Sequence, residues 1–290
     1  MEKNIPGTGD LAERISTQYY NLTAAEKRIG DYITAHEALA QTMSISELAE
    51  AGGVAEATVT RFSKRLGYKG FSELRLAIAM SVSSSGTGLS PLSGEVYETD
   101  DFSELSRKLY GVDTDALTQT LELLDEAAVN AAADILEAAE RVYCMGQGGS
   151  LVIAEEAAHL FTTVRSKYFT LHDSHTQVIA ASTMGPQDAV LYFSYSGSTR
   201  DIMQTLDIVR ARGARSILIT KYPESPGAKK ADVVLRCGAR ESPLQLGSVA
   251  AKLSQLFLLD VLFSVLCRRH LEDCRESRTR IAAALTEKHL

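Results

Sequence analysis

The stretch AVLYFSYSGSTRD, residues 189–201, decides how the second half of the chain folds. It begins with the short apolar run 189–193, passes through a Ser/Gly-rich turn at 194–198 and continues into a helical pattern from Thr199. An apolar run of this length that ends in a glycine turn is typical of a strand buried on both faces of a parallel sheet. The turn then lies at the carboxyl end of the strand, where such sheets bind ligands.

Short apolar runs alternate with longer amphipathic segments along the rest of this half. We expect strands at residues 142–145, 168–171, 190–193, 217–220 and 233–235. Helices are expected at residues 151–164, 199–212 and 246–266. This alternation predicts an α/β domain with a parallel sheet sandwiched by helices.

A Ser/Gly-rich stretch at residues 81–94 separates this half from an N-terminal block whose apolar spacing is helical throughout. The stretch has too little apolar surface to fold alone. We therefore expect an all-α domain at residues 1–80 and a linker at 81–105. The α/β domain is expected at 106–290, with a helical tail from Arg268.

Composition places the chain among ordinary globular proteins, with 45% hydrophobic and 23% charged residues. No apolar run reaches the roughly 18 to 20 uncharged residues of a membrane span, and the start lacks the apolar centre of a signal peptide, so we expect a cytoplasmic protein. No C-x-x-C pair occurs among the four cysteines, so we expect reduced thiols and neither a metal site nor a cofactor: Cys144, Cys237, Cys267 and Cys274.

The turn that follows residue 193 has the features of an anion site. Gly197 allows close backbone approach, and four hydroxyls supply donors: Ser194, Ser196, Ser198 and Thr199. A helix that starts there adds free N–H groups and the positive end of its dipole. A second loop, GQGGS at 146–150, follows another expected strand, so the two loops are expected to face one cleft. The first loop contains no lysine, which favours a small phosphorylated ligand over a nucleoside triphosphate.

Two other interpretations of these loops stay open. Small hydroxyl residues also serve as helix caps and turn residues. Residues 146–151 begin like the dinucleotide motif G-x-G-x-x-G but carry Leu151 at the sixth position. The occurrence of both loops in one alternating sheet favours a ligand site.

In the N-terminal block, residues 45–62 have the spacing of a helix-turn-helix. The S/T-x-x-E segments at 23–26 and 44–47 mark two helix starts. A glycine turn then separates two short helices, which pack through their apolar positions: Leu48, Ala49, Val54, Val59 and Phe62. The first turns of the second helix are the part that enters a major groove.

The net charge of −7 conceals a basic segment at residues 58–75, in which Glu73 is the only acid. The residues expected to bind DNA are Ser46, Thr58, Thr60, Arg61, Lys64, Arg65 and Lys69. The two threonines are placed for base edges or phosphates, Arg61 for guanine, and the last three for phosphates. A three-helix packing module with a solvated basic face is the alternative.

The loops GQGGS and SYSGST, with the following TKYPESPGAKKADVVL, resemble the sugar isomerase (SIS) domain over residues 125–266. In that family, G-x-G-x-S and S-x-S-G-x-T loops hold the phosphate and hydroxyls of a sugar phosphate. The resemblance implies effector binding by Gly148, Ser150, Ser194, Ser196, Gly197 and Thr199, with Gln147 and Ser198 as adjacent contributors.

The N-terminal block resembles the DNA-binding domain of RpiR-family transcriptional regulators through LTAAEKRIGDYI and SISELAEAGGVAEATVTRFSKRLGYKGFSELR. Joined to a SIS domain, it implies a regulator of carbohydrate metabolism genes whose operator binding is controlled by a sugar phosphate, and not an enzyme. Ala55 stands where the family commonly has a capping serine, and Ala51-Gly52 replaces Leu-Ala. A missing cap lowers helix stability by about 1 kcal/mol.

Two other functions stay open at this stage. A phosphosugar isomerase needs a general base, for which Glu241, His172 and His175 are candidates by position. A plain sugar-phosphate-binding module leaves the helix-turn-helix unexplained. The apolar helical stretches at 113–139 and 246–266 predict a homodimer through the C-terminal domain, or a tetramer, on a palindromic double-stranded DNA operator.

Overall fold

The computed structural model describes residues 11–84, 96, 99–239 and 248–286. The chain divides into two compact units: one ends at Val112, and the other begins at Asp113 and includes the C-terminal helices.

The N-terminal unit is helical. Its elements up to residue 84 are α1 (Leu11–Gln18), the 3-10 turn η1 (Tyr19–Asn21), α2 (Ala24–Ala35), α3 (Glu37–Ala40), α4 (Ile45–Ala51), α5 (Glu56–Arg65) and α6 (Phe71–Ser84). Thr23 and Ser44 both form the predicted capping boxes, with Glu26 and Glu47 respectively. The two expected helix starts are thus confirmed.

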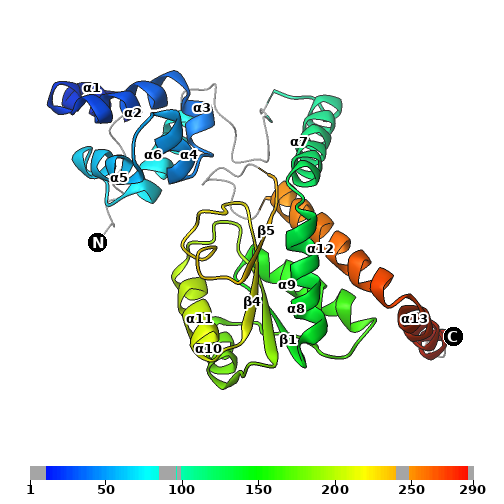
Figure 1. The fold of residues 1–290 in the computed structure, drawn as a ribbon. Helices are drawn as coiled ribbons and strands as arrows, with labels where there is room; N and C mark the ends of the chain where they lie inside the picture. Colours follow the sequence, from blue (N-terminus) through cyan, green and yellow to red (C-terminus); the bar gives the residue numbers. More distant parts are fainter. Residues whose placement is uncertain (1–10, 85–95, 97–98, 240–247, 287–290) are drawn as a thin grey trace, which may run out of the picture. The chain divides into compact units, whose positions relative to one another are not determined.

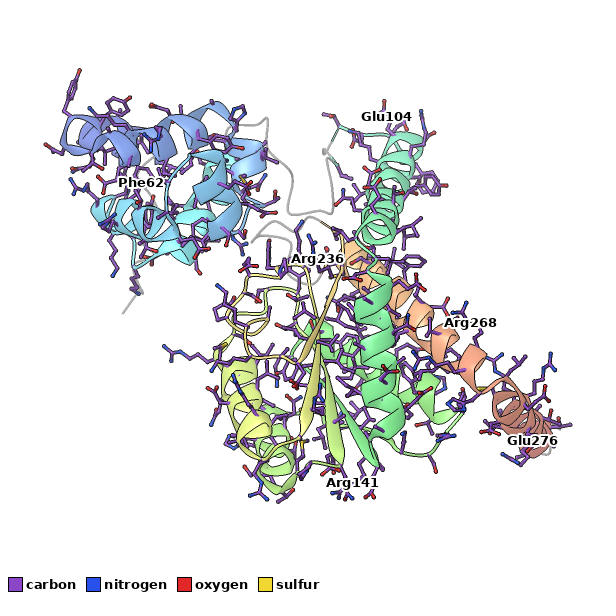
Figure 2. All side chains as sticks on the ribbon, viewed as in Figure 1. Phe62, Glu104, Arg141, Arg236, Arg268 and Glu276 are labelled. Atoms are coloured by element: carbon purple, nitrogen blue, oxygen red, sulfur yellow. The ribbon has the colours of Figure 1, made fainter. Side chains whose placement is uncertain are left out.

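One apolar cluster holds these helices together. Ile29 of α2, Leu48 of α4 and Phe62 of α5 are fully buried in it, and Figure 2 labels Phe62 within this unit. Gly30 lies in the same cluster, where an added Cβ would be 3.3 Å from Ile15 Cγ2 and 3.6 Å from the Phe62 ring. The close packing of α2 on α5 therefore sets the position of the second helix of the motif.

The C-terminal unit contains a five-stranded parallel sheet in the order β2-β1-β3-β4-β5. The strands are β1 (Arg141–Gly146), β2 (Tyr168–Thr170), β3 (Asp188–Phe193), β4 (Arg215–Thr220) and β5 (Val233–Arg236). Every expected strand is present. Arg141 and Arg236, labelled in Figure 2, mark the amino end of β1 and the carboxyl end of β5 at opposite ends of the sheet.

Helices cover both faces of the sheet, as Figure 1 shows. They are α8 (Glu126–Ala138), α9 (Gly149–Thr162), α10 (Ser174–Thr183), α11 (Arg200–Ala211) and α12 (Val249–Arg269). The α8, α9 and α12 helices share one core cluster with the sheet, and α10 and α11 share another on the opposite face. The predicted fold class, a helical domain joined to an α/β sandwich, is confirmed.

The helix bounds differ from expectation in three places. The predicted stretch 113–139 is two helices, α7 (Phe102–Glu122) and α8, because Asp125 caps a new start. The α10 helix has no counterpart in the expectations. The expected linker 81–105 is too long at both ends, since α6 runs to Ser84 and α7 begins at Phe102.

The α12 helix is long and apolar enough, by length and composition alone, to cross a membrane. Its buried side chains, which include Leu258 and Leu262, pack instead in the core cluster against α8 and α9. Such burial is expected for a core helix that is apolar on most sides. Leu246, the expected first residue of this helix, lies outside the described residues. The helical tail expected from Arg268 forms α13 (Leu271–Thr286) after the end of α12.

Candidate effector and nucleic-acid sites

The two loops chosen from the sequence leave the sheet side by side. Strands β1 and β3 are paired, with Gly146 in register with Phe193, and each loop follows directly. Both loops then enter helices, α9 and α11. The carboxyl ends of adjacent strands and the amino ends of their helices therefore converge at one edge of the sheet.

Neither of these two helices begins with a side-chain cap. Gly148 is the N-cap of α9 and has φ 54°, and Thr199 is the N-cap of α11 but its side chain makes no capping hydrogen bond. Helices α2, α4, α8 and α10, by contrast, all begin with a capping side chain. The first backbone N–H groups of α11 are consequently available to an anion. In α9 the N–H groups of Ser150 and Leu151 donate to the carbonyls of Gln147 and Gly148, both at 3.1 Å, which leaves the N–H of Gly149.

The first loop requires glycine at residue 197. Gly197 has φ 58°, and a Cβ there would lie 2.1 Å from Ser225 Oγ. The Gly227 N–H donates to the Gly197 carbonyl at 2.8 Å, so the loop that follows β4 packs directly on the 194–199 loop. This close approach places the loop after β4 beside the start of α11.

The loop hydroxyls act as turn residues without using up their donor capacity. Ser194 Oγ accepts from the Gly197 N–H at 3.2 Å, and Ser196 Oγ accepts from the Ser198 N–H at 3.4 Å. Because a hydroxyl that accepts still carries its own hydrogen, both can donate to a ligand. Ser150 is half-buried, whereas Ser198 and Thr199 are exposed. The turn interpretation and the ligand interpretation are therefore compatible.

Gln177 is a residue of this site that the sequence did not indicate. It lies on α10, is fully buried, and donates from Nε2 to the carbonyls of Gly146 and Leu171, both at 2.9 Å. Its Oε1 accepts from Gln147 Nε2 at 2.9 Å. Gln177 thus joins the carboxyl ends of β1 and β2 to the side chain of the 146–150 loop. An isolated glutamine in a helix gives no local signal of such a role.

Lys221, which directly follows β4, and Tyr195 of the 194–199 loop both bond to one backbone carbonyl. Lys221 Nζ donates to the Ala239 carbonyl at 2.6 Å, and Tyr195 Oη donates to the same carbonyl at 2.9 Å. Thr220 Oγ1 donates to the Tyr195 carbonyl at 3.0 Å, which fixes the end of β4 to the loop. A lysine after β4 therefore adds positive charge at this edge of the sheet.

Of the three candidate isomerase bases, the structure describes two, His172 and His175, and both are exposed. His172 is exposed and its Nδ1 lies 3.0 Å from Glu155 Oε1 of α9. His175 is exposed on the first turn of α10. Glu241 lies outside the described residues.

The helix-turn-helix is present, and α2 holds its turn in place. Arg28 Nε donates to the Gly52 carbonyl and Arg28 Nη2 to the Gly53 carbonyl, both at 3.0 Å. Gly53 adopts φ 60°, and a Cβ on Gly52 would lie 2.5 Å from Ile29 Cδ1. The planar guanidinium suits a pair of carbonyls. Arg28 is a second residue that the sequence did not indicate.

Most of the expected DNA-binding side chains lie on the surface of this unit. Arg61, Lys64 and Lys69 are exposed, and Thr60 and Ser46 are partly exposed. The hydroxyl of Ser46 on α4 donates to the carboxylate of Glu56 on α5, which links the two helices of the motif. Together these side chains form a basic surface along α5 and the turn after it.

Two of the expected contact residues also make contacts within the fold. Thr58 is buried, with 7% exposure, because it faces the core side of α5, and its hydroxyl accepts from Arg61 Nη2 at 3.2 Å. The prediction that Thr58 is displayed to DNA is wrong. Arg65 forms an ion pair with the buried Glu26 at 3.3 Å and donates to the Asn21 carbonyl. Its charge is directed toward α2, which disfavours a phosphate contact.

The missing cap of α5 is confirmed. Ala55 is its N-cap and makes no side-chain hydrogen bond. Thr58 does not compensate, because no side chain forms a capping hydrogen bond at this helix start. Glu56 places a negative charge in the first turn, and Arg14 Nη1 donates to the carbonyl of Leu66 at the other end, at 3.1 Å. These contacts stabilise α5 in place of a cap.

Comparison with known proteins identifies both domains. The helix-turn-helix domain of the rpiR family matches residues 9–85, and the SIS domain matches residues 135–265. An uncharacterized HTH-type transcriptional regulator of Haemophilus influenzae is 28% identical over 284 residues, which cover 98% of this chain and 99% of that protein. The HTH-type transcriptional regulator RpiR of Escherichia coli is 27% identical over 273 residues, covering 94% of this chain and 91% of that protein.

Solved structures share the fold. The NanR protein of Vibrio vulnificus, whose structure contains ManNAc-6P, has a TM-score of 0.81 at 23% identity and covers 96% of this chain and 99% of its own. The sugar isomerase domain of an RpiR transcription factor from Sphaerobacter thermophilus has a TM-score of 0.57 at 22% identity, covering 62% of this chain and 98% of its own. The chain thus has a helix-turn-helix domain of the rpiR family followed by a SIS domain, and over nearly its whole length it is similar to HTH-type transcriptional regulators, RpiR of Escherichia coli among them.

Proposed function

We propose that a sugar phosphate bound at the carboxyl edge of the sheet controls how tightly this regulator binds its operator. The observation that carries the proposal is the pair of uncapped helix starts, α9 and α11, on adjacent strands. The first N–H groups of α11, the N–H of Gly149 in α9 and the hydroxyls of Ser194 and Ser196 supply donors for a phosphate. NanR, which shares the fold, contains ManNAc-6P in its structure.

The DNA-binding surface is proposed to be α5 with its flanks. Arg61 is placed for base edges, and Lys64 and Lys69 for phosphates, with Thr60 and Ser46 beside them. A homodimer, or a tetramer built from it, would place two α5 helices about 34 Å apart on a palindromic operator. We place such a regulator in the cytoplasm.

We propose a binding role rather than a catalytic one for the SIS unit. Relatives that match over the full chain are transcriptional regulators. The expected bases His172 and His175 are exposed at the surface of the unit. A coupling free energy of about 1 to 3 kcal/mol between effector and operator would change DNA affinity roughly 5- to 150-fold.

Thermal unfolding of the full chain against sugar phosphates and their unphosphorylated sugars tests the effector site. A ligand that binds the folded state raises its stability by mass action. We expect a stabilising sugar phosphate whose effect disappears in the Ser194→Ala/Ser196→Ala variant and persists in Ser182→Ala, an exposed serine of α10. Stabilisation by the unphosphorylated sugars alone would contradict a phosphate site, and turnover of the ligand would contradict the binding role.

Fluorescence anisotropy with operator fragments from the promoters next to the gene tests the DNA surface. We expect Lys64→Ala to weaken binding and to lower the slope of log affinity against log salt by about 0.9, the contribution of one phosphate contact. The matched control is Lys229→Ala, an exposed lysine of the other unit that should leave the slope unchanged. Equal slopes for all three proteins would contradict the assignment.

A further inference from the structure

The buried Gln177 fixes the orientation of the Gln147 side chain. Both hydrogens of Gln177 Nε2 are directed at backbone carbonyls, those of Gly146 and Leu171, at 2.9 Å. A carbonyl oxygen only accepts, so the nitrogen of this amide has to face these two carbonyls. The oxygen of Gln177 therefore faces Gln147, and it can only accept as well.

Gln147 must consequently turn its amide nitrogen toward Gln177. The observed distance from Gln147 Nε2 to Gln177 Oε1 is 2.9 Å. The reverse orientation would place two carbonyl-type oxygens against each other in a buried network, which is unfavourable. Because the oxygen and nitrogen of an amide lie on opposite sides of its carbon, the oxygen of Gln147 is directed away from the network. Gln147 itself is half-buried.

Tyr192 closes the network from β3. It is 1% exposed, and its hydroxyl lies 3.5 Å from Gln177 Oε1. Burial, and after it the charge of Asp201, raise the pKa of Tyr192 to about 12. With its nitrogen on Gln177 Oε1, Gln147 keeps its oxygen outside the network.

We propose that Gln147 presents its Oε1 to the effector as a hydrogen-bond acceptor, and that Gln177 is the positioning residue that holds it so. This inference rests on the proposed effector site. Phosphate oxygens are themselves acceptors at neutral pH and cannot pair with this oxygen. The phosphate therefore lies at the N–H groups and hydroxyls of the 194–199 loop, and Gln147 meets a donor on the sugar: a hydroxyl or an amide N–H.

The effector is accordingly a sugar phosphate with a hydrogen-bond donor on the part of the sugar that faces the 146–150 loop. Inorganic phosphate carries no sugar, so when it occupies the 194–199 loop it presents no group to Gln147 and should be indifferent to that residue. A site built to pair with a donor discriminates against ligands without one, because its polar group is otherwise left unpaired.

Calorimetric titration of four variants with two kinds of probe tests the acceptor. The probes are inorganic phosphate and a panel of hexose 6-phosphates that includes glucose, glucosamine and N-acetylmannosamine 6-phosphates. The variants are Gln147→Met, Gln177→Met, the double variant, and Gln204→Met as a matched control on the exposed surface of α11. We expect Gln147→Met to weaken the best sugar phosphate about tenfold, the effect of one lost hydrogen bond. Phosphate affinity should stay within about twofold.

The double variant separates positioning from a general structural effect. If Gln177 acts through Gln147, adding Gln177→Met to Gln147→Met should leave the ratio of sugar-phosphate to phosphate affinity unchanged, because coupled residues are not additive. Two independent losses that multiply would overturn the positioning role. An equal loss of phosphate and sugar-phosphate affinity in Gln147→Met would overturn the assignment of a sugar donor.

Hydrogen exchange of side-chain amides, followed by NMR without ligand, decides the orientation even if no sugar phosphate binds. The NH₂ protons of Gln147 should exchange at least tenfold more slowly than those of Gln204, and lose this protection in Gln177→Met. Equal exchange of Gln147 and Gln204 in the wild type would overturn the orientation. Protection of Gln147 without any sugar-phosphate binding would refute the proposed function, and with it the ligand donor, while leaving the network in place.

Discussion

Replacing Gly197 by alanine tests whether the 194–199 loop needs glycine for space as well as for backbone conformation. A Cβ at residue 197 would lie 2.1 Å from Ser225 Oγ and 2.8 Å from Ser225 Cβ, at a φ of 58°. Gly148 offers a matched control, because it has φ 54° and no atom lies within 4 Å of its added Cβ. Both substitutions place a side chain at a positive φ, and only Gly197→Ala adds the collision.

The magnitudes follow from these two contributions. A side chain at such a φ costs about 1 to 3 kcal/mol in either variant. Crowding by Ser225 adds about 1 to 3 kcal/mol in Gly197→Ala alone, the usual range for an overpacked site. A difference of about 1 kcal/mol corresponds to roughly 2 to 4 °C in Tm for a unit of 150 to 250 residues.

Urea and thermal unfolding of the full chain, followed by circular dichroism at 222 nm because the chain has no tryptophan, measure the difference. The Gly197→Ala/Ser225→Gly variant removes both close atoms and leaves Thr220 Oγ1 at 3.2 Å. Relative to Ser225→Gly alone, it should show only the backbone penalty. The reasoning is refuted if Gly197→Ala destabilises the Ser225→Gly background as much as it destabilises the native chain.

Three further predictions concern the helix-turn-helix and the thiols. Arg28→Met should lower the local stability of the turn by about 1 to 2 kcal/mol, since two hydrogen bonds are lost. The backbone amides of residues 52–54 should then exchange with solvent faster. Arg28→Lys should restore little of their protection, because lysine cannot contact both carbonyls. Unchanged amide exchange would contradict the role of Arg28 in holding the turn. Ala55→Ser should stabilise α5 by about 1 kcal/mol and slow exchange of its first amides about fivefold, whereas Ala57→Ser, inside the helix, should not. Burial raises the pKa of Cys144 to about 12 and that of Cys237 to about 11, so both stay protonated at pH 8; iodoacetamide should label them only after unfolding in urea, and rapid labelling of the folded chain would contradict their burial.

The strands could be predicted because each one is a short apolar run that ends in turn residues. The α10 helix could not, since its sequence SHTQVIAAST has few apolar residues at helical spacing and its start depends on Asp173. The early start of α7 was hidden because its first turns, residues 103–108, are mostly polar and charged. Periodicity thus located the elements that build the core and failed for helices with a weak apolar face.

The site shows the same division between local and tertiary information. The two loops were predictable because their chemistry is contained in six or fewer consecutive residues. Gln177 was not, because its partners Gly146 and Gln147 lie 31 and 30 residues away. Arg28 likewise acts on carbonyls 24 and 25 residues away. Thr58 was assigned to the wrong side of α5, since spacing alone does not fix which flank of a short helix meets α2.

The distribution of helix caps explains why the effector site should couple to the fold around it. Helices α2, α4, α8 and α10 satisfy their first amides with their own side chains. Helix α11 does not, and it forgoes a contribution of about 1 kcal/mol. Helix α9 begins with Gly148, which forgoes only about a few tenths of a kcal/mol, and its Ser150 and Leu151 N–H groups already donate to carbonyls. An anion bound at the two starts would accept from the first N–H groups of α11 and from the N–H of Gly149. Because α9 and α11 cover opposite faces of the sheet, a single phosphate would stabilise both helix layers, which is how a small ligand can alter the stability of the whole unit.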